Sequence, residues 1–412
     1  MGPSRSRLSK GGWTLCKIFG VELSAGNGRC TELTLPATPY AMLDALEKLR
    51  LEEGEEPQWE ILRTHGCDRI YPYLNEEDSL TELNALCQQL ALLDERQAAI
   101  VEGLLKAESD QGVHPIPMAQ VINMAHSTDR CHLVEEATND YTLGRFCAEN
   151  SFVPEADDLS DKAFELLDFA RIGREFRQNE GGVFTSGGYV QKHDELRQVY
   201  GTLNLTPKTP DYAVLVQTAS GCEIKLPLPM GEAVADGPVQ CVDCAAPSLI
   251  GLTSTIGTWD MLAHQLTYLT VDGELTKYKA VLTAIHCDDP NRALALVDEL
   301  EQYTLSPQIL EYEDVAKERL AAVLPTEEVD LISQRLNLYG FGQDLVEHRS
   351  GGLTGYGLVE HKGAEQEQTG APTEAQRSGF GGERSRSEMS ELSPQAEAND
   401  MELGATNEME MM

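Results

Sequence analysis

One glycine-rich stretch occurs twice in this chain, and no other feature constrains the fold as much. Residues 173–190 read GREFRQNEGGVFTSGGYV, and residues 342–359 read GQDLVEHRSGGLTGYGLV. Glycine permits the positive φ of a helix stop or a tight turn, so each stretch predicts a helix end followed by a turn and a strand. The chain is therefore predicted to contain two diverged copies of one unit. The matched positions are Gly173, Gly182, Thr185, Gly188 and Val190 in the first copy, and Gly342, Gly351, Thr354, Gly357 and Val359 in the second.

The duplication divides the 412 residues into five predicted segments. A short basic leader and a long acidic tail hold few large apolar residues, so they cannot bury a core and are expected to be disordered. Between them lie a first repeat, a proline-containing linker, and a second repeat whose loops differ in length from those of the first. Within the repeats, Leu226-Pro227 is expected to match Leu35-Pro36. The segments are 1–12, 13–200, 201–211, 212–362 and 363–412.

The first repeat is predicted to begin with a β-hairpin around the Gly-Asn-Gly turn at residues 26–28. Thr38 is a predicted N-cap with Pro39 at the first helical position, and residues 59–62 form the next predicted strand. The second repeat is expected to restate this opening, with residues 240–244 in place of the strand at 59–62.

Helices are predicted to fill the middle of the first repeat. Ser79 with Glu82 three residues later predicts a capping box, and Asp94 predicts the start of another helix. Apolar residues at helical spacing predict one helix over residues 160–176. With the strands, these helices predict an α+β fold, an elongated chain of small α/β and helical-cluster domains duplicated in tandem.

The chain carries a large negative charge. Its 68 Asp and Glu residues against 32 Lys and Arg give a net charge of −36, of which −32 lies on residues 14–360. Duplex DNA carries one charge per ~1.7 Å, so the charge of the repeats equals that of about 54 Å of duplex. Such a surface repels nucleic acid and anionic lipid and attracts basic partners, while acidity that serves only solubility is the alternative explanation.

The apolar runs and cysteines argue for a cytoplasmic protein. No apolar run approaches the ~20 residues that a bilayer span requires, and scattered cysteines suit reduced thiols. Cys241 and Cys244 form a CxxC motif, but a zinc ribbon needs a second such pair. In a regular strand the two side chains are also expected to face opposite sides.

No catalytic constellation stands out in the sequence. The nine histidines are spread singly, and neither a nucleophile elbow nor an EF-hand pattern occurs. The glycine stretch runs helix, glycines, strand, which is the reverse of a phosphate-binding loop. We therefore expect no enzymatic activity, no cofactor and no metal site.

Two segments resemble antirestriction proteins of the ArdA type. They are SLTELNALCQQLALLDERQAAIVEGLL at residues 79–105 and FELLDFARIGREFRQNEGGVFTSGGYV at residues 164–190. The resemblance covers most of the first repeat and, more weakly, the second. It implies an acidic DNA mimic, encoded on a mobile element, that occupies the DNA-binding groove of type I restriction-modification enzymes without catalysis. The family is usually dimeric, so either a homodimer or an intramolecular pseudo-dimer of the two repeats is expected.

The resemblance implies a distributed surface of carboxylates, in which no single residue is catalytic. The alternative function is an acidic adaptor that binds another basic protein of a mobile element, and an enzyme of unknown type is the third possibility. By position in the first repeat, the nominated acids are Asp44, Glu47, Glu52, Glu53, Glu55, Glu56, Glu76, Glu77, Asp78, Glu82, Asp94 and Glu95.

Overall fold

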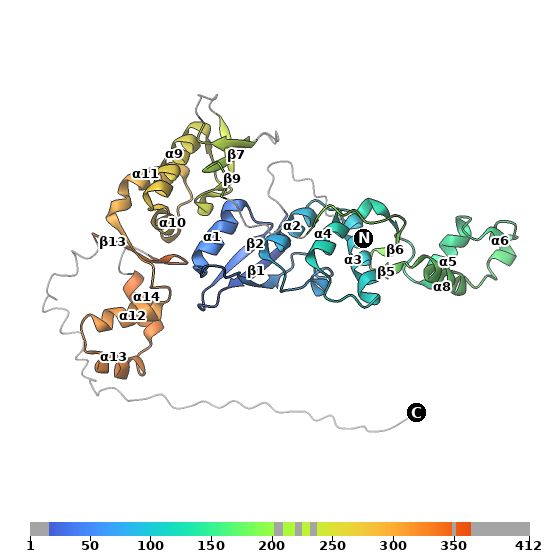
Figure 1. Ribbon diagram of the computed structural model, residues 1–412, viewed down its shortest axis with the longest axis horizontal. Helices are drawn as coiled ribbons and strands as arrows, with labels where there is room; N and C mark the ends of the chain where they lie inside the picture. Colours follow the sequence, from blue (N-terminus) through green and yellow to red (C-terminus); the bar gives the residue numbers. More distant parts are fainter. Residues whose placement is uncertain (1–15, 202–208, 219–224, 231–236, 348–351, 364–412) are drawn as a thin grey trace, which may run out of the picture. The chain divides into compact units, whose positions relative to one another are not determined.

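The first repeat opens with a three-stranded antiparallel sheet whose middle strand comes first in the sequence (Figure 1). The Gly-Asn-Gly turn closes the predicted hairpin, because Gly28 adopts a φ of +82° and the Asn27 amide donates to the Leu49 carbonyl at 2.9 Å. The strand order is β2-β1-β3, with β1 (Phe19–Ser24), β2 (Cys30–Leu35) and β3 (Gln58–Arg63). The computed structural model describes residues 16–201, 209–218, 225–230, 237–347 and 352–363.

Helix α1 (Pro39–Leu49) begins where the sequence predicts. The Thr38 hydroxyl accepts a hydrogen bond from the Ala41 N–H, and Pro39 occupies the first helical position, where its missing N–H costs nothing. The helix ends at Arg50, which adopts the left-handed conformation with a φ of 50°.

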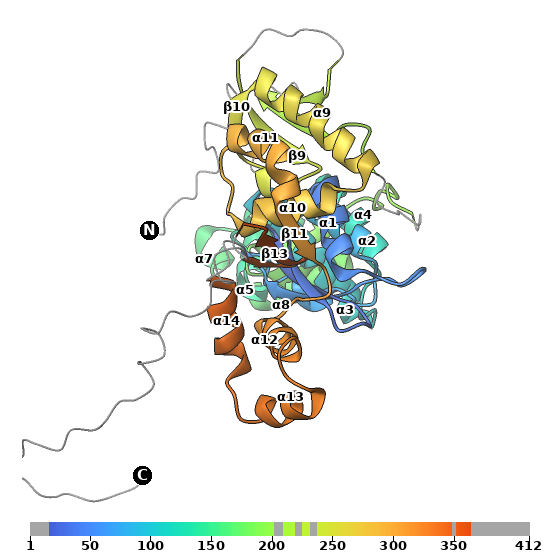
Figure 2. The same cartoon turned by 90° about the vertical axis from the view of Figure 1, so that its left-hand side faces the viewer.

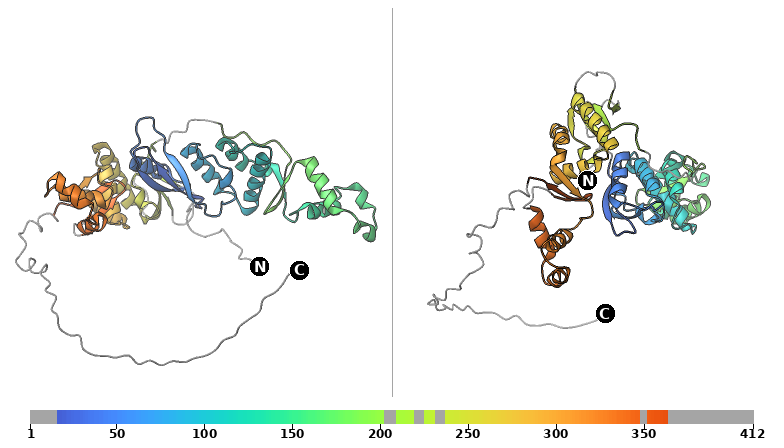
Figure 3. Two further views of the ribbon diagram at one scale, coloured as in Figure 1. Left: turned by 90° about the horizontal axis from the view of Figure 1, so that it is seen from below. Right: turned by 60° about the vertical axis from the view of Figure 1, so that its left-hand side comes forward.

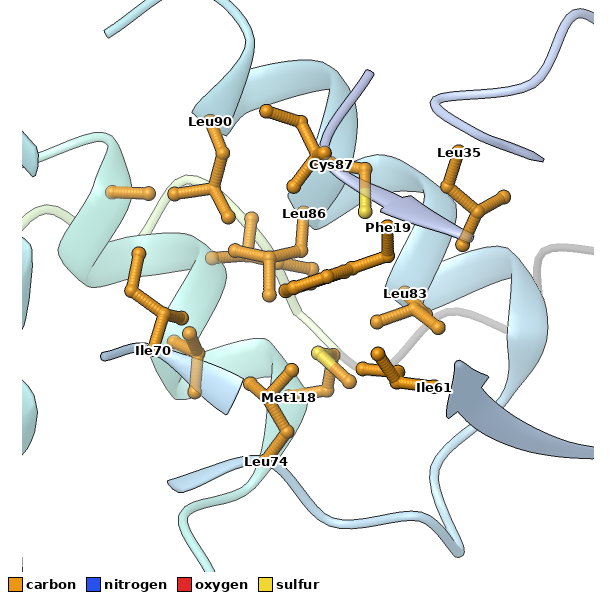
Figure 4. Packing of buried hydrophobic residues seen from close by; sticks show 14 of the residues in the cluster. Phe19, Leu35, Ile61, Ile70, Leu74, Leu83, Leu86, Cys87, Leu90 and Met118 are labelled. Atoms are coloured by element: carbon orange, nitrogen blue, oxygen red, sulfur yellow. The ribbon is translucent and has the colours of Figure 1, made fainter. Parts of the chain in front are cut away.

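The main core of the first repeat lies between this sheet and three helices. Figure 4 shows Phe19 of β1 among Leu83 and Leu86, which helical spacing places on one face of α2. All three side chains are fully buried, and each such burial stabilises the fold by about 1.5–3 kcal/mol. The helices are α2 (Leu80–Leu90), α3 (Glu95–Asp110) and α4 (Met118–Ala125); the short helical turn η1 (Tyr71–Tyr73) precedes them and η2 (Thr128–Arg130) follows them.

A second antiparallel sheet, of order β4-β6-β5, packs against α3. The approach is close at Gly103 of α3, where a Cβ atom would lie 2.6 Å from the Cβ of Val190. Between β4 and β5 the chain forms a separate helical layer. The elements are β4 (Cys131–Val134), α5 (Asp140–Glu149), α6 (Pro154–Asp157), α7 (Asp161–Phe164), α8 (Phe169–Glu180), β5 (Val183–Thr185) and β6 (Gly188–Lys192).

The single helix predicted over residues 160–176 is wrong, because the chain breaks between α7 and α8. Asp168 takes a non-helical conformation, and its carboxylate caps α8 by accepting from the Arg171 N–H at 3.0 Å. The break turns the chain so that Phe169 is buried, with its ring 5.3 Å from that of Phe164. The N-cap at Asp168 therefore decides where α8 begins, although the helical spacing of apolar residues continues across it.

The second repeat builds its own pair of sheets, of order β10-β9-β7-β8 and β11-β13-β12 (Figures 2 and 3). Trp259, Leu262 and Leu266 of α9 fill its main core and are fully buried. The strands are β7 (Val214–Thr218), β8 (Lys225–Leu228), β9 (Pro238–Cys244), β10 (Thr253–Thr255), β11 (Tyr303–Ser306), β12 (Gly352–Thr354) and β13 (Gly357–His361). The helices are η3 (Pro247–Leu249), α9 (Ile256–Asp272), α10 (Leu275–Ala284), α11 (Pro290–Glu299), η4 (Leu300–Gln302), α12 (Tyr312–Ala321), α13 (Thr326–Ser333) and α14 (Leu338–Glu347).

The opening sheets of the two repeats share strand order and register. Ile18 N donates to Leu35 O at 2.8 Å, and Ala213 N donates to Leu228 O at the same distance. The residue matching Leu35 is therefore Leu228, and the predicted match of Leu35-Pro36 to Leu226-Pro227 is wrong by two residues. Successive side chains of a strand point to opposite faces, so a shift of two residues does not change which face a position occupies. The apolar pattern of the sequence therefore cannot reveal the shift.

Helix α1 has no room for a counterpart in the second repeat. Residues 36–57 join β2 to β3 and contain α1, whereas residues 229–237 alone join β8 to β9. That connection is shorter than the 11 residues of α1 itself. At this point the second repeat is therefore too short to hold a helix of the length of α1.

The two glycine corners, by contrast, have one geometry. Gly188 and Gly357 adopt φ values of +130° and +138°, and a Cβ atom would lie 2.3 Å from the Val134 carbonyl oxygen at the end of β4 or 2.4 Å from the Ser306 carbonyl oxygen at the end of β11. Each turn is closed by a threonine hydroxyl that donates to the glycine carbonyl, from Thr185 at 3.0 Å and from Thr354 at 2.8 Å. Among the matched glycines, Gly351 lies outside the described residues.

The described residues form an α+β fold with four small antiparallel sheets interleaved with helices, as the sequence predicts. They belong to one compact unit that ends at Glu365. The predicted leader (1–12), the centre of the predicted linker (202–208) and the predicted tail beyond Gly363 lie outside the described residues. No helix in the described part of the chain is both long and apolar enough to cross a membrane.

Candidate acidic binding surface

Four of the nominated acids line one hollow of about 590 Å³ on the first repeat: Glu56, Glu76, Glu77 and Asp78. The start of β3 forms one wall, and the segment before α2 forms the other. Trp59 ties the walls together, because its buried ring donates from Nε1 to the Asp78 carbonyl at 2.7 Å. A rigid tryptophan therefore positions carboxylates from two separate segments around one opening.

Asp78 differs from the other acids of this hollow. Its Oδ2 atom accepts from the Met118 N–H at 2.9 Å, and burial raises the pKa of its carboxyl. Its role is to hold the start of α4. Glu56, Glu76 and Glu77 are exposed, so their charges face the solvent at the rim.

The loop between α1 and β3 presents further carboxylates. Glu55 shapes it, because its carboxylate accepts from the N–H of Glu52 at 2.9 Å and of Gly26 at 2.6 Å. These two backbone hydrogen bonds lower the pKa of Glu55. Glu52, Glu53 and Glu56 are exposed on the loop that Glu55 fixes.

Glu82 and Asp94 lie at the N-termini of α2 and α3 and take part in capping them. Asp94 accepts from the Gln97 N–H at 2.7 Å and forms a full capping box on α3. The Ser79 hydroxyl accepts from the Glu82 N–H at 3.2 Å, but the Glu82 carboxylate returns to the Ser79 hydroxyl at 3.3 Å. The predicted N-cap is thus confirmed, while the reciprocal bond to the Ser79 backbone is not made.

A second hollow, of about 600 Å³, has mixed charge. Asp94 and the exposed Glu95 line it with Lys17 and Arg69, and Arg69 lies 3.4 Å from the Glu102 carboxylate. The basic groups offset part of the acidic charge there. The hollow beside Trp59 is therefore the more strongly acidic of the two.

Asp44 and Glu47 lie elsewhere, against the second repeat. Asp44 is 6% exposed, and its carboxylate lies 2.6 Å from Lys279 Nζ and 2.9 Å from Lys48 Nζ. Burial raises the pKa of Asp44, but the two ammonium groups outweigh it and hold the pKa below its usual value. Glu47 also pairs with Lys279. Both nominated acids are neutralised within the chain.

Sequence reasoning missed Lys279 and its partners. Lys279 lies in the run Tyr278–Leu282, where every other side chain is buried and apolar. A lysine inside such a run was the available signal, because a lysine is almost never fully buried unless it is paired. Nothing local to it, however, identifies a carboxylate some 235 positions earlier as the partner.

Cys241 and Cys244 form no reactive site. The expectation that they face opposite sides is wrong, because a register shift in β9 opposite Leu215 and Val216 turns both into the core. A hydrogen bond with Cys244, together with burial, raises the pKa of the Cys241 thiol far above its usual range. Such thiols stay protonated and unreactive.

The glycine stretches hold the packing together. Gly173 lies where a Cβ atom would be 1.9 Å from the Asp140 carbonyl, and Gly342 where it would be 1.8 Å from the Tyr312 carbonyl. At Gly182 a Cβ atom would meet the Tyr189 hydroxyl at 2.3 Å. These glycines therefore let neighbouring segments approach closely.

The first repeat thus presents exposed carboxylates around the Trp59 hollow and on the loop before it. Metal binding finds no support in the described ranges, where no group of three or more His, Cys, Asp and Glu side chains is placed to hold an ion. The acidic surface is suited to a basic partner. Comparison with models of known protein families and with curated proteins finds no match for this chain.

Proposed function

We propose that this protein is an antirestriction DNA mimic, which binds type I restriction-modification enzymes and blocks them without catalysis. The observation that carries the proposal is a set of exposed carboxylates on the first repeat. Glu56, Glu76 and Glu77 line the hollow beside Trp59, and Glu52 and Glu53 lie on the loop before β3. The resemblance of residues 79–105 and 164–190 to ArdA-type proteins supports it.

The charge of the chain agrees with this role. A DNA-binding groove is lined with basic side chains, which gain by neutralising about one phosphate per contact. A protein of net charge −36 can offer carboxylates in place of those phosphates. The interaction acts in the cytoplasm, where restriction enzymes meet incoming DNA, and it needs neither a cofactor nor a bound nucleic acid.

The direct test is inhibition of a purified type I restriction enzyme on unmodified DNA. We expect protection at about one protein per binding site, lost steeply as salt rises, because ionic contacts are screened. Polyglutamate at equal total charge is the control. If it protects the DNA equally well, acidity alone explains the effect and the mimic is refuted.

A capture experiment separates mimicry from the adaptor function. The tagged full chain is incubated with host lysate at low salt, and bound proteins are identified. Recovery of restriction or modification subunits supports the mimic. Recovery of other basic proteins, with no protection of DNA in the inhibition assay, supports the adaptor.

A further inference from the structure

Helix α1 packs against both repeats, with a different face on each. Met42, Ala45 and Leu49 belong to the core of the first repeat, as their helical spacing predicts. Tyr40 packs instead against the core of the second repeat, and Asp44 lies one turn further along the same side. One helix therefore contributes to two hydrophobic cores.

Lys279 of α10 is the centre of the contact on the second face. It is 4% exposed, and it pairs with the carboxylates of Asp44 and Glu47. Tyr356 completes the group, since its hydroxyl donates to Asp44 at 2.7 Å and its ring centroid lies 5.2 Å from Lys279 Nζ. A buried ammonium needs such partners, because an unpaired charge in the interior is strongly destabilising.

A second group of hydrogen bonds holds the start of α1. The Tyr40 hydroxyl donates to the Tyr212 carbonyl at 2.5 Å, and the Tyr40 N–H lies 3.4 Å from Asp243 Oδ2. Tyr212 donates to the same Asp243 oxygen at 2.9 Å. Asp243, at the end of β9, is only 2% exposed, so the acceptor of these hydrogen bonds is shielded from solvent.

The two repeats differ in sequence at residues that make this contact. At the glycine corner, the position of Tyr356 is occupied in the first repeat by Gly187, where a Cβ atom would lie 2.5 Å from the Cβ of Ala99. The corner of the first repeat packs on its own α3, whereas the corner of the second repeat reaches α1. The second repeat has lost the connection that could hold a helix of its own and gained a tyrosine that binds the helix of its neighbour.

We propose that α1 is a helix shared by both repeats, and that Lys279 locks the second repeat onto it. The occupant of this surface is therefore the second repeat of the same chain. The second repeat depends on the lock for its stability, and α1 is closed to external partners while the lock is in place.

Hydrogen exchange on the full chain tests the proposal with Lys279→Met, which fills the same space without the charge. Lys277→Met on the same helix is the matched control, since Lys277 is 22% exposed and pairs at 3.2 Å with Glu274 of its own repeat. We expect the amides of β7 and β9 to exchange about a hundredfold faster in Lys279→Met, and less than about twofold faster in the control. The amides of β1 and β3 are expected to change far less, because the first repeat keeps its own core.

Equal exchange in the two variants would overturn the proposal, and so would faster exchange confined to the first repeat. If Lys279→Met does not fold, Tyr356→Phe provides a milder opening of the lock. The double variant Asp44→Asn with Lys279→Met gives an independent measure. It should exchange more slowly in β9 than Lys279→Met alone, because it also removes the charge of the buried carboxylate that has lost its Lys279 partner. Additive effects would show that the two residues act separately, against a lock.

Discussion

The two repeats agree at their glycine corners and disagree at their opening sheets. Both corners place a glycine at positive φ against a backbone carbonyl, and both are closed by a threonine hydroxyl. The sheets share strand order, but the connection between the outer and third strands contains α1 in the first repeat and is shorter than α1 in the second. The repeats therefore agree where the backbone geometry requires glycine, and they differ where α1 contacts both of them.

The largest expected effect concerns the feature that the repeats share. Gly188→Ala and Gly357→Ala should each destabilise the fold by about 3 kcal/mol or more, since a Cβ atom would collide with a strand carbonyl at a strained φ. Gly181→Ala is the control, because Gly181 also has a positive φ, +68° in the milder left-handed region, while nothing lies within 4 Å of the added atom. It should cost about 1 kcal/mol. Denaturant unfolding measures all three, and a large difference between Gly188→Ala and Gly357→Ala would break the likeness of the corners.

Local chemistry explains which parts of this comparison the sequence predicts. The hairpin at Gly28, the start of α1 at Pro39 and the cap at Asp94 depend on neighbouring residues only, and all three are confirmed. The break at Asp168 is local too, but it competes with an apolar pattern that favours one long helix. A candidate N-cap inside a segment of helical apolar spacing is therefore as informative about the helix boundary as the spacing itself.

Other features depend on contacts that no local pattern contains. The register shift that turns Cys241 and Cys244 to one side comes from the pairing of β9 with β7. The burial of Asp44 comes from a lysine in the other repeat, so an acid that looks exposed on an amphipathic helix is neutralised. The nominated acids on loops, such as Glu53 and Glu56, are exposed because no element packs over them.

The next effect concerns the contact that only the second repeat makes. Tyr356→Phe removes the hydroxyl that donates to Asp44, and we expect a loss of about 2 kcal/mol in the free energy of unfolding, typical of a hydrogen bond to a charged group. Tyr268→Phe is the control, because Tyr268 is 62% exposed on α9. Calorimetry of both variants measures the difference. Equal melting temperatures would mean that the corner of the second repeat, like that of the first, serves only its own repeat.

The pH dependence of stability sharpens the same contrast at a smaller scale. The folded-state pKa of Asp44 is lowered, so its contribution is complete above the ordinary aspartate pKa of about 3.9 and is lost as the pH falls through the lower folded value. In Asp44→Asn the slope of stability against pH below about 4 should be shallower, because the carboxylate that gains from Lys279 is gone. An unchanged slope in urea unfolding would show that Asp44 gains nothing from Lys279.

The smallest effect on stability should accompany a clear effect on function. Glu76→Gln with Glu77→Gln removes two exposed charges from the Trp59 hollow, and unfolding should change by less than about 0.5 kcal/mol. Binding to the restriction enzyme should weaken about threefold to tenfold, since each exposed charge contributes up to ~1 kcal/mol. Glu327→Gln with Glu328→Gln removes the same charge from exposed positions of α13 in the second repeat. If both pairs weaken inhibition equally, binding follows net charge and the two repeats are equivalent, whereas a loss confined to the first pair places the mimicry in the first repeat.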